Sequence, residues 1–210
     1  MYSKNSFCII ICLLITILCF SNLNSQNIDI DILRNIYHER NESFDPTLVS
    51  ISNSVLPISI TTPIIVYTFG ASTNTISNKQ KGIYIAESLV VSGLLTYAIK
   101  NISKRDRPYE TYDDIQNITN AEGYTFPSGH TSAAFATATS LSIVYPKWYV
   151  IFPSFTWATA VGYSRMALGV HYPSDVLFGA IVGSGSAYLT YKLNKWVNKK
   201  REPKQKILWE

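Results

Sequence analysis

Three short segments of the chain carry side chains whose types and spacing suit phosphate chemistry. They span residues 100–108, 127–130 and 164–175, and from residue 123 to 191 only Lys147, Arg165 and Asp175 are charged. Lys100, Arg107 and Arg165 supply three positive charges, and the planar Arg side chains match the oxygens of a phosphate group. Because ionisable groups are costly in apolar surroundings, they normally mark a functional site there.

The middle segment, Pro127-Ser128-Gly129-His130, adds neutral groups that suit the same anion. Ser128 offers a hydroxyl, and Gly129 lets the backbone approach an anion closely. A helix expected to begin near Thr131 directs its free N–H groups at the same place. The segments therefore predict a site for a tetrahedral oxyanion of high negative charge.

The two histidines of these segments can divide the chemistry. His171 precedes Asp175 by four residues, at a helix start expected near Pro173, and resembles a nucleophile held in one tautomer by a carboxylate. His130 lies beside the anion site and is suited to protonate the departing oxygen. Phosphate-ester hydrolysis requires accelerations of up to ~10²¹-fold, which we expect positioning and arginine charge to supply. No His, Cys, Asp or Glu cluster has metal-ligand spacing, so we predict neither a metal nor another cofactor.

Taken together, the segments match the pattern K-x6-R-P, P-S-G-H and S-R-x5-H-x3-D at every fixed position. Over roughly residues 44–195 the chain resembles the type 2 phosphatidic acid phosphatase and vanadium haloperoxidase superfamily. The resemblance implies an all-α bundle, a phosphohistidine intermediate, a nucleophile–orienter pair of His171 and Asp175, and an acid role for His130. It also implies phosphate binding by Lys100, Arg107, Ser128, Gly129 and Arg165. The run 168–176 is more similar to the membrane lipid-phosphate branch than to the soluble acid phosphatases.

The elements that must position these residues are long, weakly charged helices. Charged residues make up 15% of the chain, against roughly 25% in soluble domains, and 47% of its residues are hydrophobic, which excludes a disordered chain. No charge occurs between residues 46 and 78. Many small residues suit close helix contact in a bilayer. We predict a membrane-embedded bundle of five spans, with helical runs at 54–70, 83–99, 131–145, 149–163 and 176–193.

The N-terminus is typical of an export signal. Residues 7–20 are uncharged and nearly all apolar, follow Lys4, and contain all three cysteines. We predict a signal peptide over 1–25; the alternative is an uncleaved sixth span. An amphipathic helix is expected at 29–43, within a segment 26–45 that precedes the phosphatase bundle 46–195 and a basic cytoplasmic tail 196–210.

Charge placement predicts the orientation of the bundle. If Lys79, Lys81, Lys147 and the tail face the cytoplasm, the positive-inside rule is obeyed and the three motif segments lie outside. We therefore expect a multi-pass protein of a bacterial inner membrane, with its active site facing the periplasm. Expected partners are a lipid phosphate substrate and membrane lipids, with no nucleic acid and no obligate protein partner.

Several alternatives remain open at this stage. Substrates in question are phosphatidic acid, phosphatidylglycerol phosphate, undecaprenyl pyrophosphate and lipid A phosphate. Other readings are a secreted soluble nonspecific acid phosphatase, a vanadate-dependent haloperoxidase and a non-enzymatic lipid-binding protein. Outside the motifs, His38 is expected to be solvated, and Glu87 to pair with a Ser or Thr. Lys104 and Arg105 could extend the anion site, meet lipid head groups or be solvated.

Overall fold

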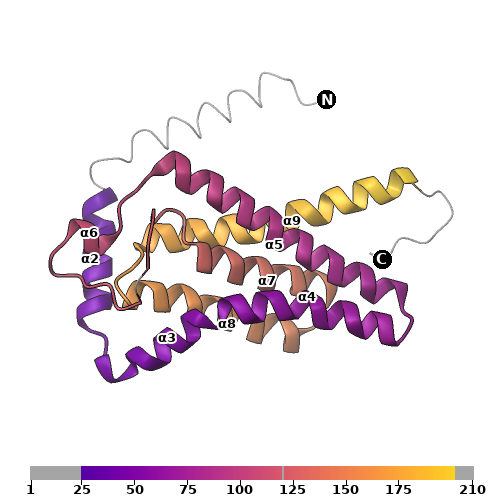
Figure 1. Cartoon of the computed structure of the whole chain (residues 1–210), viewed down its shortest axis with the longest axis horizontal. Helices are drawn as coiled ribbons and strands as arrows, with labels where there is room; N and C mark the ends of the chain where they lie inside the picture. Colours follow the sequence, from indigo (N-terminus) through magenta and orange to yellow (C-terminus); the bar gives the residue numbers. More distant parts are fainter. Residues whose placement is uncertain (1–24, 120, 202–210) are drawn as a thin grey trace, which may run out of the picture.

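The computed structural model describes residues 25–119 and 121–201, which form helices and connecting loops without a β-strand (Figure 1). In chain order the elements are α2 (Ser25–His38), the 3-10 helix η1 (Glu42–Phe44), α3 (Asp45–Asn53), α4 (Val55–Ser72), α5 (Ile76–Ser103), α6 (Pro108–Thr111), α7 (Gly129–Val144), α8 (Trp148–Ala167) and α9 (Pro173–Arg201). The expected signal peptide, apart from its last residue, and most of the tail lie outside the described residues.

The five predicted helical runs correspond to α4, α5, α7, α8 and α9, and three of them, α5, α8 and α9, extend beyond the predicted bounds at both ends. Helix α7 begins at Gly129 rather than near Thr131, because Ser128 caps it by accepting a hydrogen bond from the Thr131 amide. Helix α5 continues to Ser103 and ends where Lys104 adopts a left-handed conformation, with φ 46°. The start of α7 and the end of α5 both lie in motif segments, so the capping of these helices determines the positions of the site residues.

Helix α7 is the centre of the bundle and contacts α4, α5, α8 and α9. Its buried residues are nearly all small: Thr131, Ser132, Ala134, Ala136, Thr137, Ala138, Ser140 and Val144. Glycine in α9 brings the two backbones together, since a Cβ at Gly179 would lie 2.8 Å from the Ser128 carbonyl oxygen. The predicted close packing of small residues is therefore present where α9 crosses the start of α7.

The amphipathic helix ends earlier than predicted, at His38 instead of residue 43. After it the chain turns, because the Arg40 guanidinium lies 4.0 Å from the centroid of the Tyr37 ring and its Nε donates to Asp45 at 3.0 Å. The apolar face of this helix is buried in part: Ile30 and Leu33 pack with Tyr172, whereas Ile28 and Ile32 are exposed. Helix α2 lies across the end of the bundle, next to α6 (Figure 1).

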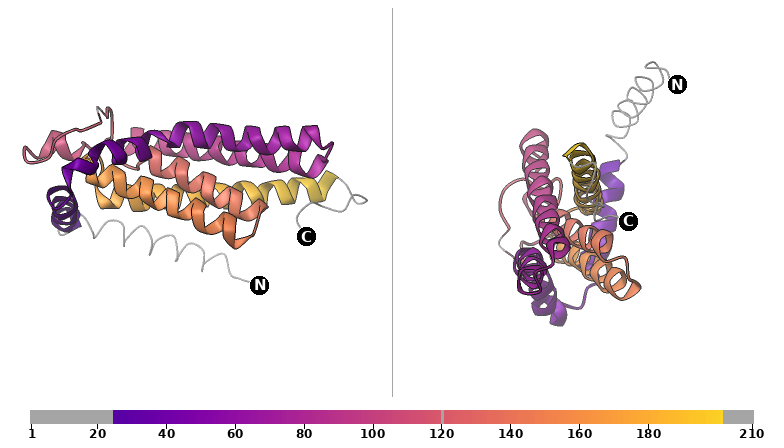
Figure 2. Two further views of the ribbon diagram at one scale, coloured as in Figure 1. Left: turned by 90° about the horizontal axis from the view of Figure 1, so that it is seen from below. Right: turned by 90° about the vertical axis from the view of Figure 1, so that its right-hand side faces the viewer.

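Much of the outer surface of the bundle is apolar. Glu42–Ser72 and Ile76–Thr111 are long and apolar enough to cross a membrane, judged by length and composition. The long helices run side by side along the length of the molecule (Figure 2). Large apolar side chains point outward from them, such as Ile65 and Leu94, and Phe152, which is 71% exposed.

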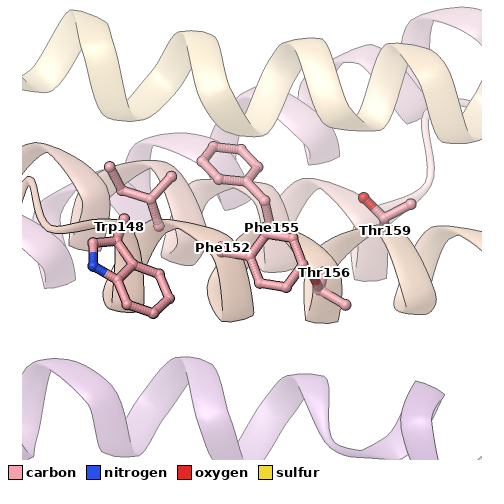
Figure 3. A pocket seen from close by; sticks show the side chains of 6 residues that line it. Trp148, Phe152, Phe155, Thr156 and Thr159 are labelled. Atoms are coloured by element: carbon pink, nitrogen blue, oxygen red, sulfur yellow. The ribbon is translucent and has the colours of Figure 1, made fainter.

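An open apolar groove of about 570 Å³ follows the outer face of α8. It is lined by Trp148, Ile151, Phe152, Phe155, Thr156 and Thr159. Figure 3 shows these side chains along one side of the helix, in the part of α8 that precedes its motif residues. Such a surface would be unfavourable in water, because contiguous apolar area of this kind is normally covered in soluble proteins.

Candidate active site

The three motif segments meet at the end of the bundle that α2 and α6 cover (Figure 1). The Ser128 amide donates to the Asp175 carbonyl at 3.0 Å, which joins the second segment to the third. The Arg107 guanidinium donates to the Val170 carbonyl at 2.9 Å, which joins the first to the third. Segments that are far apart in the sequence are thus joined into one site by hydrogen bonds to backbone carbonyl oxygens.

A tight turn between α8 and α9 presents His171. Gly169 in this turn has φ +74°, and a Cβ there would lie 2.6 Å from the Gln116 carbonyl oxygen, so only glycine fits. Helix α9 begins at Pro173, as predicted, and places Asp175 in its first turn. The Asp175 carboxylate folds back, with Oδ2 3.4 Å from His171 Nδ1.

A threonine hydroxyl completes this pair. Thr125 Oγ1 donates to Asp175 Oδ2 at 2.5 Å and lies 2.9 Å from His171 Nδ1. A hydroxyl has one proton, and since that proton goes to the carboxylate, Thr125 accepts from Nδ1–H. The imidazole is thereby fixed in the tautomer whose lone pair is on Nε2.

His171 is 2% exposed, and its Nε2 faces cations. Nη1 of Arg107 lies 3.5 Å from Nε2. Burial lowers the pKa of His171 well below its ordinary value; Asp175 opposes this shift, and the charges of Arg165 and Arg107 add to it. The neutral imidazole is therefore the resting form, with a lone pair available on the atom that faces the cations.

Arg107 is fixed by three carbonyl oxygens. Its Nε donates to Gly123 at 2.7 Å and its Nη2 to Glu122 at 2.8 Å, in addition to the Val170 bond of Nη1. A guanidinium has five N–H donors, so two of them are not used by these three bonds. The Arg107 guanidinium is therefore held in one orientation, and its two unused N–H groups remain available to an anion next to His171.

Arg165 on α8 is 3% exposed and only partly satisfied. Its Nη1 donates to Ser52 Oγ of α3 at 2.5 Å. Its Nε is buried and has no hydrogen-bond partner among the described residues. Because buried polar groups are nearly always hydrogen-bonded, this donor indicates a missing acceptor at the site.

Lys100 and His130 are both half-buried. Lys100 Nζ donates to the carbonyl oxygens of Tyr124 and Thr125, which leaves one of its three protons for another acceptor. His130 follows Gly129 in the first turn of α7. The charges of Arg165 and Arg107 act on both histidine rings, so His130 and His171 lie near the same cations.

Ser128 and Gly129 form the side of the site at the start of α7. Ser128 Oγ accepts from the Thr131 hydroxyl at 2.9 Å, which leaves its own proton for another acceptor. A Cβ built at Gly129 would meet only Thr96 Cγ2, at 3.8 Å. The space beside the Gly129 backbone is therefore open, as close approach of an anion requires.

All eight predicted site residues thus belong to this end of the bundle, and three further residues were missed: Thr125 contacts His171, Ser52 contacts Arg165, and Asp29 reaches Asp175 through Arg105. Arg105, for which the sequence left the anion site, lipid head groups and solvation open, donates to Asp175. Thr125 precedes the second motif by only two residues, and this proximity was the one signal in the sequence for the missed residues. In residues 25–119 and 121–201, no three His, Cys, Asp or Glu side chains are grouped so that they could hold a metal ion.

Of two expectations outside the motifs, one was confirmed and one was wrong. The His38 side chain is 52% exposed, as expected, and its Nε2 also lies 3.3 Å from Asp114 Oδ2. Glu87 pairs with an amide instead of a hydroxyl: Asn194 Nδ2 of α9 donates to Glu87 Oε2 at 2.6 Å. Neither residue belongs to the site.

The sequence also matches a family model described as the PAP2 superfamily, over residues 81–199, which is more than half of the chain. The chain belongs to the PAP2 superfamily. The matched region contains all three motif segments, so the family resemblance that the sequence motifs predicted is confirmed.

Individual relatives within the superfamily match over part of the chain. A lipid A 1-phosphatase of Rhizobium etli is 32% identical over 114 residues, 52% of this chain and 48% of that protein. An undecaprenyl-diphosphatase of Sulfolobus acidocaldarius is 29% identical over 116 residues, 55% of this chain and 56% of that protein. The chain thus spans about half the length of these relatives.

Two crystal structures have a similar fold. Aquifex aeolicus LpxE has a TM-score of 0.69 and 24% identity, covering 79% of this chain and 95% of that one. A transmembrane PAP2 type phosphatidylglycerolphosphate phosphatase from Bacillus subtilis also has a TM-score of 0.69, with 21% identity, covering 98% of this chain and 100% of that one. The all-α fold class predicted from the sequence is confirmed.

Proposed function

We propose that this PAP2 protein is an integral membrane phosphatase that hydrolyses a lipid phosphate or pyrophosphate through a phosphohistidine intermediate. The observation that carries the proposal is the unsatisfied Nε of Arg165, in a site where Arg107 and Lys100 also have donors to spare. A phosphate group would supply the missing acceptor. The free lone pair of His171 Nε2 borders the same site.

In the first step of the proposed reaction, His171 Nε2 attacks the phosphorus atom and forms a P–N bond. The bond between phosphorus and the leaving oxygen breaks, and His130 donates a proton to that oxygen. Asp175 and Thr125 stabilise the imidazole as it gains positive charge. The cations and the Ser128 hydroxyl neutralise charge on the phosphoryl oxygens, which is the main catalytic term in such reactions.

In the second step, water attacks the phosphohistidine and His130 accepts a proton from that water. The P–N bond breaks, inorganic phosphate is released, and His171 returns to its neutral form. The same residue thus acts first as acid and then as base, as in other double-displacement hydrolases.

Placement in a bilayer is supported by the outward-facing apolar side chains and by the two long apolar segments. The substrate class is supported by the names of the relatives, which are a lipid A phosphatase and an undecaprenyl-diphosphatase. We propose the inner membrane of a bacterium as its location. Lys79, Lys81 and Lys147 would face the cytoplasm and the site would face the periplasm, because this orientation obeys the positive-inside rule.

The test is phosphate release by purified protein in detergent with EDTA present. The substrates are phosphatidic acid, phosphatidylglycerol phosphate, undecaprenyl diphosphate and lipid A, with p-nitrophenyl phosphate as a soluble ester. We expect at least one lipid to be hydrolysed well above the soluble ester, and His171→Ala to be inactive but folded. Full activity of His171→Ala would refute the mechanism. Release of the protein from membranes without detergent, together with a preference for the soluble ester, would favour a soluble acid phosphatase instead.

A further inference from the structure

We propose that Asp29 and Arg105 are positioning residues for the catalytic carboxylate, so that the N-terminal helix α2 completes the active site. The inference rests on the proposed role of Asp175 as the residue that orients His171. It assigns a function to α2, which carries none of the three motifs.

The two residues form a continuous chain of contacts to Asp175. Arg105 Nη1 donates to Asp175 Oδ1 at 2.9 Å, and Arg105 Nη2 donates to Asp29 Oδ2 at 2.7 Å. Asp29 also accepts from the Ser174 amide at 2.8 Å and from the Ser174 hydroxyl at 2.5 Å. Arg105 and Asp29 therefore hold the first turn of α9 from the side opposite to His171.

The two oxygens of the Asp175 carboxylate have different hydrogen-bond partners. Oδ2 accepts from Thr125 and from the Tyr172 amide, and so serves the imidazole side. Oδ1 accepts from Arg105. Asp175 is 0% exposed, so neither oxygen has water as an alternative partner. With both oxygens bound, the carboxylate has a single orientation.

Charge explains why Asp29 is needed as well as Arg105. An unshared guanidinium beside Asp175 would draw the carboxylate's negative charge away from His171, and that charge must stabilise the imidazolium-like transition state. Asp29 is 7% exposed and shares the same guanidinium. Arg105 can therefore fix Asp175 geometrically while its charge is balanced by Asp29.

Helix α2 is secured by contacts independent of Asp29. Ile30 and Leu33 pack against Tyr172, and Arg34 makes two hydrogen bonds to Asp114, at 2.8 and 3.1 Å. Arg105 itself lies over the Tyr172 ring, 3.8 Å from its centroid. Removing the charge of Asp29 should therefore leave α2 docked, and the charge effect can be measured separately from folding.

The test compares Asp29→Asn and Arg105→Gln with Asp31→Asn, an isosteric change at an exposed position of the same helix. Phosphate release from the best lipid substrate gives kcat and KM, and thermal unfolding in detergent reports folding. For Asp29→Asn we expect kcat to fall about 10- to 100-fold, by analogy with the loss of hydrogen-bond partners of metal ligands. KM should stay within a few-fold, and Asp31→Asn should match the parent.

A second measurement does not depend on turnover. The chain has three histidines, so ¹⁵N-histidine NMR of the full chain in detergent can follow the protonation of His171. The charged groups around His171 are Asp175 on α9, Arg165 on α8, Arg107 at the start of α6 and Arg105 behind Asp175; Lys100 on α5 and His130 on α7 border the same space. Asp29→Asn frees the charge of Arg105 and should lower the pH at which His171 protonates, whereas Arg105→Gln should raise it.

Shifts in these opposite directions, with a lower kcat in Asp29→Asn at unchanged thermal stability, would support the positioning role. Parental kcat and an unchanged His171 titration in Asp29→Asn would overturn it. So would a loss of activity that only follows a loss of folded protein. If the parent hydrolyses no lipid, the proposed function fails, and the titration still decides the inference.

Discussion

The hydroxyl oxygen of Thr125 lies 2.9 Å from Nδ1 of His171. The O–H group of Thr125 donates to Asp175, so the imidazole is held through a threonine as well as by the carboxylate. The direct distance from Nδ1 to the carboxylate is longer, 3.4 Å. The hydroxyl therefore determines the tautomer of the proposed nucleophile as much as the acidic residue does.

Thr125→Val tests this arrangement, because valine keeps the shape of threonine and removes the hydroxyl. Nδ1–H would lose its nearer acceptor and Asp175 Oδ2 one of its donors, so the imidazole could rotate or change tautomer. We expect kcat for lipid phosphate hydrolysis to fall about 100-fold, less than the ~10⁴-fold known for loss of a triad carboxylate. Thr125→Ser restores the hydroxyl and should recover most of the activity. Equal activity of the valine and serine variants would contradict the role.

The proposed nucleophile also predicts a particular pH dependence. Burial depresses the pKa of His171, and a depressed histidine pKa means that the neutral, nucleophilic form persists as the pH falls below the ordinary value of about 6.5. Protonation of His171 should therefore cause no loss of kcat/KM between pH 7 and pH 5. The measurement is a pH–rate profile with ¹⁵N-histidine NMR over the same range. An NMR titration of His171 centred near 6.5 would disprove this.

The sequence singles out the motif residues but not the residues that support them, for a physical reason. The motif residues are ionisable and match a spaced pattern in a chain with few charges, which is enough to propose them: Lys100, Arg107, Arg165 and the two histidines. Thr125 is a neutral hydroxyl in a chain rich in Ser and Thr. Its proposed function appears only when the fold places it between His171 and Asp175.

Asp29 could not be found for a different reason. It reaches Arg105 across 76 residues, from a helix whose position depends on the packing of Ile30 and Leu33 against Tyr172. On the sequence it is one of several charges in an amphipathic segment. The helix boundaries likewise depended on capping, since Ser128 moved the start of α7 to Gly129. Periodicity predicted which segments are helical, but not these contacts at their ends.

Gly129→Ala probes the open space beside the start of α7. The new methyl group would meet only Thr96, at 3.8 Å, so the fold should accept it. It would instead occupy space that we assign to the phosphate group. We therefore expect KM to rise about tenfold or more, and a tenfold rise corresponds to about 1.4 kcal/mol of lost binding free energy. Gly93→Ala on α5 is the matched control, because a Cβ there meets no atom within 4 Å and the fold should accept it as well. Equal KM values for the two variants would place the anion elsewhere.

Ser52→Ala tests how the Arg165 guanidinium is positioned. Ser52 is 0% exposed and accepts from Arg165 Nη1, so alanine would leave a second buried donor of this guanidinium without a partner. An unsatisfied buried donor costs about 1–3 kcal/mol, and we expect thermal stability in detergent to fall accordingly. Bound phosphate should offset part of the loss, because it supplies the acceptor that the guanidinium lacks. Ser50→Ala is the control: this serine is exposed on the same helix, and its hydroxyl donates to the backbone carbonyl of Pro46, one turn earlier. If inorganic phosphate stabilises Ser52→Ala no more than Ser50→Ala, Arg165 does not bind the anion.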